Sequence, residues 1–117
     1  MRWKAVCKLG RQLPEVVEGE TYGVPALSVR GSLVARLLPD KKSIAVKVGL
    51  DERAALCASR PETFVVTPEF QNYSMMIVRL TTIGDGEMWP ILVDSWRRSA
   101  PPRLAAEFEA RRTPGDY

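Results

Sequence analysis

Apolar and polar residues alternate over three consecutive stretches in the first half of the chain. The pattern predicts strands at 26–30, 32–38 and 43–48. Leu27 and Val29 share one face of the first strand, and tight turns are expected at Gly31-Ser32 and at 39–42. These features predict an antiparallel sheet that packs one face against helices and exposes the other face to water.

A period of three to four residues predicts helices before and after this meander. The other predicted elements are helices at 2–12, 51–59, about 85–98 and 103–112, strands at 64–66 and 75–80, a connector at 15–19 and a loop at 67–72. Asp51 and Asp85 are expected to cap two helices, and Pro90 requires the third helix to begin late or to kink. The order predicts one α+β domain over residues 1–112 and a flexible tail at 113–117.

The composition is that of a single globular domain. The chain has 117 residues, 45% of them hydrophobic, so it can bury one core without disulfides or metals. No apolar run approaches the roughly 20 residues of a membrane helix, and the N-terminal segment lacks a signal-peptide pattern. A cytoplasmic protein with no membrane contact is therefore expected. Cys7 and Cys57 lie in apolar helical patterns and are interpreted as free thiols.

The chain contains no histidine, which excludes several kinds of active site. Ser-His-Asp and Cys-His nucleophile systems need an imidazole base, and the usual zinc sites need imidazole ligands. Carboxylates could in principle supply acid–base chemistry, but nothing in the spacing of Glu15, Glu18, Glu20 and Glu69 pairs them. We therefore expect no enzymatic activity, no cofactor and no metal site.

The basic residues indicate a binding function instead. The chain carries 17 Lys and Arg against 14 Asp and Glu, and its net charge of +3 permits nucleic-acid binding where cations are concentrated. Strand alternation places several cations on the face opposite the core, beside two lysines of the second turn. The predicted phosphate contacts are Arg30, Arg36, Lys41, Lys42, Lys47 and Arg79. The alternative is a solvated face whose cations protect the sheet from edge pairing.

Two other groups of cations lie on predicted helices. Lys4, Lys8 and Arg11 share the polar face of the first helix. The second group comprises Arg97, Arg98, Arg103, Arg111 and Arg112. Cations near a helix C-terminus stabilise the helix dipole, which is a sufficient explanation for the second group.

The aromatic residues divide into a core set and a surface set. The expected core residues are Trp3, Phe64, Trp96 and Phe108. The expected surface residues are Tyr22, Phe70, Tyr73 and Trp89. Exposed aromatic rings among cations suit base stacking on single strands, or alternatively anchor a partner protein.

Motifs along almost the whole chain, from about residue 3 to 109, resemble those of one known family. Two of the most specific are Tyr22-Gly23-Val24-Pro25-Ala26 and Phe64-Val65-Val66-Thr67-Pro68, and further matches include Leu13-Pro14-Glu15-Val16 and Ser95-Trp96-Arg97. In these motifs the chain resembles the MmcQ/YjbR family. The resemblance implies a frataxin-like (CyaY-like) fold of order α-β-β-β-α-β-β-α-α. It also implies a proposed double-wing DNA-binding arrangement, in which two hairpin turns reach the DNA, and no established enzymatic activity.

The wing candidates are the turns Arg30-Gly31-Ser32 and Asp40-Lys41-Lys42-Ser43. These two turns lie at opposite ends of the same predicted strand. Both turns can therefore contact one DNA molecule only if the DNA lies along the sheet face. The chain departs from the family after Thr67-Pro68, where relatives usually carry histidine-tyrosine and glycine-tyrosine pairs. Here the segment reads Glu69-Phe70-Gln71-Asn72-Tyr73, so a function of this loop in relatives does not transfer.

The leading hypothesis is a non-enzymatic DNA-binding protein that is monomeric or weakly homodimeric. One alternative is a protein-interaction domain anchored by the exposed aromatic residues. Another is a small-ligand-binding domain with its pocket near Tyr22 and the 69–73 loop. A contiguous positive surface, an exposed apolar patch and a deep polar concavity, respectively, would separate these hypotheses.

Overall fold

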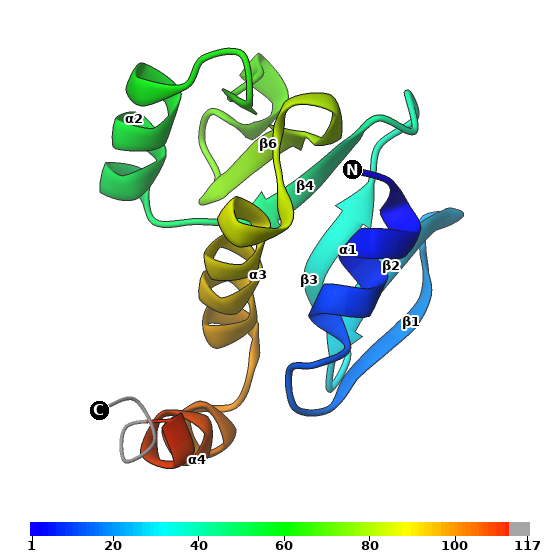
Figure 1. Cartoon of the computed structure of the whole chain (residues 1–117), viewed down its shortest axis with the longest axis vertical. Helices are drawn as coiled ribbons and strands as arrows, with labels where there is room; N and C mark the ends of the chain where they lie inside the picture. Colours follow the sequence, from blue (N-terminus) through cyan, green and yellow to red (C-terminus); the bar gives the residue numbers. More distant parts are fainter. Residues whose placement is uncertain (113–117) are drawn as a thin grey trace.

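The computed structural model describes residues 1–112 and has an α+β fold around one antiparallel sheet (Figure 1). The strands are β1 (Val16–Thr21), β2 (Val24–Val29), β3 (Ser32–Leu37), β4 (Ser43–Lys47), β5 (Phe64–Val65) and β6 (Met75–Arg79). The helices are α1 (Trp3–Gly10), α2 (Leu50–Ser59), α3 (Asp85–Ser99) and α4 (Pro102–Arg112), with 3-10 turns at Pro68–Phe70 and Leu80–Thr82. The predicted α+β class is confirmed, while the frataxin-like assignment stays a prediction.

The sheet contains a strand that the sequence pattern did not predict. Its six strands run in the order β1-β2-β3-β4-β6-β5, and the segment predicted as a connector at 15–19 belongs mostly to the edge strand β1. The four central residues of β1 are exposed, so the strand shows no apolar alternation. Tyr22 and Gly23 both have positive φ, 50° and 77°, and form the two-residue turn that pairs β1 with β2.

This additional strand places two turns at the same end of the sheet. The β1–β2 turn at Tyr22-Gly23 and the β3–β4 turn at 38–42 lie together because each antiparallel strand reverses the chain direction. We call this the Tyr22 end. The other end carries the β2–β3 turn at Arg30-Gly31, the last residue of β4 and the first residue of β6, and we call it the Arg30 end.

The core lies between α1, α3 and one face of the sheet (Figure 1). Trp96 of α3 is fully buried in this core, and its Nε1 donates a hydrogen bond to the carbonyl of Pro14. Its ring meets Phe108 of α4 edge to face, with 5.0 Å between the centroids. A Cβ atom on Gly10 would lie 2.6 Å from a side-chain carbon of Leu27, so a larger residue here would force this buried leucine to move. Among the described residues, no helix is long and apolar enough to span a bilayer.

Helix α3 is also hydrogen-bonded into the sheet. β3 and β4 pair directly from Ala35 to Leu37, and beyond that point the Ser95 hydroxyl bridges them. Its Oγ accepts the N–H of Lys47 at 3.0 Å and donates to the carbonyl of Val34 at 2.6 Å. The fully buried Ser95 thereby satisfies two backbone groups that a strand ladder would otherwise pair.

Two predicted helix caps are wrong, and one of the two alternatives for the third helix is excluded. Helix α3 begins at Asp85 and runs through Pro90, so the late start is excluded. The N-cap residues of α2 and α3 are Gly49 and Gly84 in place of Asp51 and Asp85. Both aspartates lie in the first helical turn, where their charge still favours the helix dipole. The tail predicted at 113–117 lies outside the described residues.

The sheet face opposite α1 and α3 is partly covered, contrary to the prediction of a solvated face. Strand β4 is buried on both sides, including Ser43 and Ala45. Phe70, which was expected at the surface, is buried over Arg36. Arg53 of α2 holds the covering segment by donating to the carbonyls of Phe70, Gln71, Tyr73 and Met75 at 2.8–3.2 Å. A distant helix therefore decides how exposed this face is.

Candidate nucleic-acid interface

Three of the six predicted phosphate contacts are held in intramolecular contacts. Arg30 donates two hydrogen bonds to the Glu15 carboxylate, at 2.7 and 2.9 Å. The Arg36 guanidinium lies 5.5 Å from the centre of the Phe70 ring and 4.0 Å from Glu69, and its side chain is only 20% exposed. The sequence pattern could not reveal these partners because they come from a loop and from the residue just before β1.

Lys47 is the third of these residues. Its ammonium group donates to the Ser32 hydroxyl at 2.9 Å, and burial lowers the pKa of this lysine. A half-buried cation with lowered pKa contacts phosphate less readily than a solvated one. Lys47 therefore does not contribute to an open basic face.

The other three predicted contacts are exposed. Arg79 lies opposite Ser43 in the β4–β6 ladder, and Lys41 and Lys42 lie in the β3–β4 turn. The neighbouring Asp40 forms no ion pair within 4.0 Å with these lysines, although the nearby charge of Lys42 contributes a little to its lowered pKa. Its carboxylate accepts the N–H groups of Lys42 and Ser43 and the Ser43 hydroxyl, which hold the pKa of Asp40 below its usual value.

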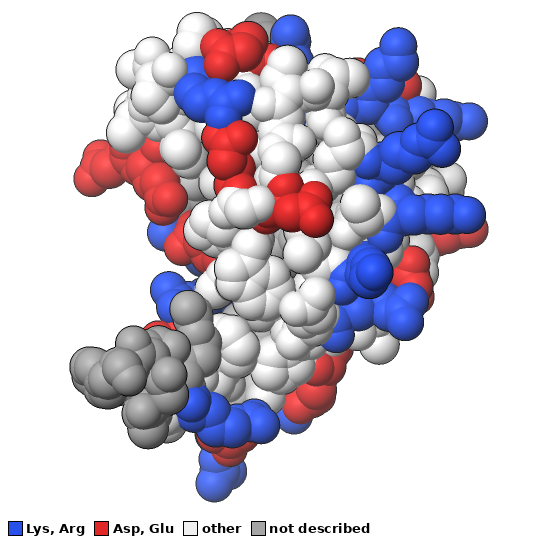
Figure 2. Space-filling view, viewed as in Figure 1, with Lys and Arg blue, Asp and Glu red and all other residues white. Residues whose placement is uncertain are grey.

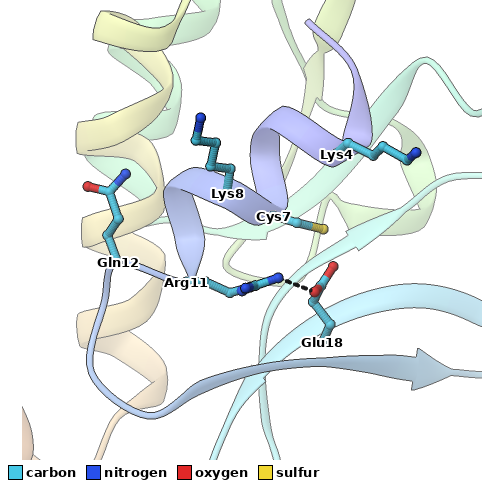
Figure 3. A pocket seen from close by; sticks show the side chains of 6 residues that line it. All are labelled: Lys4, Cys7, Lys8, Arg11, Gln12 and Glu18. Atoms are coloured by element: carbon cyan, nitrogen blue, oxygen red, sulfur yellow. Dashed lines mark hydrogen bonds and ion pairs between the residues drawn. The ribbon is translucent and has the colours of Figure 1, made fainter.

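The exposed turn lysines belong to a larger group of cations around α1. Arg2, Lys4, Lys41 and Lys42 line one hollow of about 520 Å³. Lys4, Lys8 and Arg11 line a second hollow of about 500 Å³, between α1 and β1 (Figure 3). Lys4 belongs to both hollows, so the two form one continuous surface. We define the basic surface as Arg2, Lys4, Lys8, Arg11, Lys41 and Lys42.

Figure 2 shows these charges crowded on the side of the molecule where α1 and the β3–β4 turn lie. In the described part of the chain, Arg11 alone among them pairs with a carboxylate, that of Glu18 at 2.8 Å. Elsewhere arginines are mostly paired, as Arg60 is with Glu62 and Glu87. The basic surface is therefore the place where cations without acidic partners are concentrated.

The thiol and the carboxylate in the hollow between α1 and β1 are poorly suited to act as nucleophile and base. Burial and the neighbouring Glu18 carboxylate raise the pKa of Cys7 to about 12, so its thiol is protonated at neutral pH and a poor nucleophile. The Glu18 pKa is lowered by its contacts with Cys7 and Arg11, which leaves it a weak base. No group of three or more metal-ligating side chains occurs within residues 1–112.

The surface aromatic residues predicted as a partner-binding set are not gathered in one place. Tyr22 and Tyr73 are exposed, by 98% and 64%, while Trp89 is half-buried against the core. Tyr73 lies at the Arg30 end, next to Ser74, whose carbonyl accepts the N–H of Val48. Since Tyr22 is almost fully exposed at the Tyr22 end, it forms no pocket with the 69–73 loop.

Of the core aromatic residues, Phe64 and Trp96 are buried as predicted, and Trp3 and Phe108 pack partly buried against the core. Both cysteines are free, with Cys7 buried and Cys57 half-buried.

Comparisons with known proteins supply relatives but no function. No protein-family model and no solved structure matches the chain. Uncharacterized protein Mb2600 of Mycobacterium bovis and Uncharacterized protein Rv2570 of Mycobacterium tuberculosis are each 31% identical over 74 residues, 62% of this chain. The match covers 57% of each relative, so the chain spans little more than half the length of these curated relatives. The MmcQ/YjbR resemblance stays a prediction.

Proposed function

We propose that this chain is a non-enzymatic nucleic-acid-binding module that contacts phosphates through the basic surface. One observation carries the proposal: the cations of α1 and the β3–β4 turn lie together and, apart from Arg11, lack carboxylate partners among the described residues. Phosphate binding releases counterions from the nucleic acid, and only cations that are not already neutralised within the protein contribute fully.

The proposed contact set differs from the one predicted by strand alternation. Lys41 and Lys42 remain in it, and Arg2, Lys4, Lys8 and Arg11 are added. Arg30, Arg36 and Lys47 are omitted because their side chains are engaged within the protein. Arg79 is exposed but is omitted because it lines neither hollow.

The two turns of the Tyr22 end are the wings in this proposal. The turn at Tyr22-Gly23 replaces the predicted wing at Arg30-Gly31, which lies at the other end of the sheet. The new pair of turns can face one ligand together, whereas the predicted pair could do so only if the DNA lay along the sheet face. The N-terminus of α1 lies at the same end, where the Met1 nitrogen donates to the Leu80 carbonyl at 2.6 Å.

The test is fluorescence anisotropy with a labelled DNA duplex at several salt concentrations. The variant Lys4→Ala/Lys41→Ala/Lys42→Ala removes three cations of the basic surface. We expect weaker binding and a slope of log affinity against log salt that is shallower by about 2.7, which is three times the roughly 0.9 of each phosphate contact.

The matched control is Arg30→Ala/Arg97→Ala/Arg98→Ala, which removes the same charge from residues paired with Glu15, Glu109 and Asp94. This control should bind nearly as the parent chain does. Equal losses in the two variants would mean that net charge alone drives binding. Absence of binding by the parent chain to both this duplex and a labelled single strand at low salt would refute the proposed function.

A further inference from the structure

Tyr22 is the most exposed of the large apolar side chains in the part of the chain that the structure describes. Its ring is 98% exposed, compared with 64% for Tyr73 and 59% for Val17. It therefore gains almost nothing from burial. Its φ of 50° is strained for a bulky side chain, and asparagine or glycine would suit this turn better. Neither packing nor turn geometry explains a tyrosine at this position.

The hairpin fixes the backbone that carries this ring. β1 and β2 pair without interruption from Val16 opposite Val29 to Thr21 opposite Val24, so the turn contains only Tyr22 and Gly23. Both turn residues adopt left-handed conformations, as a tight two-residue hairpin turn requires. Because the backbone of the turn is already ordered, it loses little further conformational freedom when the ring binds a ligand.

The ring also lies at the same end of the sheet as the turn lysines of the basic surface. The β1–β2 and β3–β4 hairpins are two strand spacings apart, about 10 Å in a flat sheet. Lys41 and Lys42 are exposed at the tip of the second hairpin. The Tyr22 end thus combines an exposed aromatic face with exposed cations that form no ion pair within 4.0 Å among the described residues.

We propose that Tyr22 stacks on an unpaired base, and that the ligand of the basic surface is nucleic acid with single-stranded character. This inference rests on the proposed function. In a duplex the bases stack on one another, whereas an unpaired base offers its face to an aromatic side chain. Lys41 and Lys42 hold the adjoining phosphates.

The residues around Tyr22 favour this ligand over a protein partner. A protein hot spot needs a surrounding surface that excludes water, but the only apolar neighbours at this hairpin tip are Val24 and Pro25, beside Thr21, Gly23 and Glu20. Glu20 is an exposed carboxylate on the same hairpin, so the phosphates lie on the lysine side of the ring.

The experiment compares three labelled probes: single-stranded oligothymidylate, an abasic strand of the same length, and a duplex. Tyr22→Ala should bind oligothymidylate at least about 5-fold more weakly than the parent chain. This is the smallest loss of affinity expected when one base–aromatic stacking contact is removed. Its affinity for the abasic strand and its salt slope should not change, because no phosphate contact is removed. Tyr22→Phe, which keeps the ring, should bind as the parent chain does.

The matched control is Tyr73→Ala, which removes an exposed tyrosine from the Arg30 end and should bind all three probes normally. Tyr22→Asn is a second variant that lacks the ring and suits the left-handed turn, so it separates loss of stacking from loss of folding. Undiminished oligothymidylate binding by Tyr22→Asn would overturn the stacking proposal, while salt-dependent binding of the parent chain would leave the proposed function standing. If the parent chain binds no probe at low salt, both proposals fail.

Discussion

At the Arg30 end of the sheet the arginines serve the fold, whereas at the Tyr22 end the cations face solvent. Arg30 is bound to Glu15 and Arg53 to four backbone carbonyls. Lys41 and Lys42 are exposed and, among the described residues, form no ion pair within 4.0 Å. The comparison teaches that the number of cations on a surface is weak support for phosphate binding, and that their availability matters more.

Acidic residues show the same division. At the Arg30 end, Glu15 neutralises a guanidinium directly. At the Tyr22 end, Asp40 accepts hydrogen bonds from the turn backbone and the Ser43 hydroxyl. The turn thus uses its own carboxylate mainly for folding, while the side chains of its two lysines stay exposed to solvent.

The largest expected effect in this comparison is on stability, in the variant Arg53→Ala. Loss of its hydrogen bonds releases the segment that covers the sheet, and we expect the free energy of unfolding to fall by about 2 kcal/mol. Chemical denaturation measures this change. Lys42→Ala, at the other end, should stay within about 0.5 kcal/mol of the parent chain. Similar losses in both variants would contradict the division between structural and available cations.

A smaller effect is expected in affinity when Glu18 is neutralised. Glu18→Gln removes the only carboxylate that pairs with the basic surface in the described residues, and it frees Arg11. We expect nucleic-acid binding to tighten about two- to threefold, since exposed ion pairs are weak. Anisotropy titration measures it, and Glu15→Gln at the Arg30 end is the control that should tighten binding less. An equal increase in affinity in both variants would contradict the proposal that nucleic acid binds at the basic surface.

The smallest expected effect concerns pH. The hydrogen bonds from Arg30 lower the pKa of Glu15. The stability that this pair contributes is therefore present above the ordinary glutamate pKa and is lost as the pH falls through the lowered value. Because both side chains are exposed, the contribution is small.

Arg30→Ala should raise the pKa of Glu15 toward its ordinary value, as measured by NMR titration of the side-chain carboxyl. The same variant should leave the pKa of Asp40 low, because backbone and hydroxyl donors of the β3–β4 turn cause that shift. A change at Asp40 would show that the two ends are electrostatically coupled.

The local pattern predicted most elements to within a few residues, including the meander formed by β2, β3 and β4. It missed β1 because an edge strand that is exposed along its centre has no apolar alternation to detect. That one omission hid the hairpin that carries Tyr22. It also left the two predicted wings at opposite ends of one strand.

The candidate site was only partly visible in the sequence. Helical spacing placed Lys4, Lys8 and Arg11 on one face of α1, and the turn pattern exposed Lys41 and Lys42. Their neighbourhood could not be predicted, because it depends on how α1 packs beside the β3–β4 turn. The same limit applies to Arg36, since its cover by Phe70 involves a segment that Arg53 holds from another helix.

By itself, the sequence determined the α+β class, the lack of histidine chemistry and the cations that α1 and the turns present. These properties follow from residue types and from patterns that extend over only a few neighbouring residues. Only the tertiary structure decided which cations are paired, which sheet face is covered and which turns share an end. Those outcomes depend on contacts between residues far apart in the chain, such as Arg53 with Tyr73 and Lys47 with Ser95.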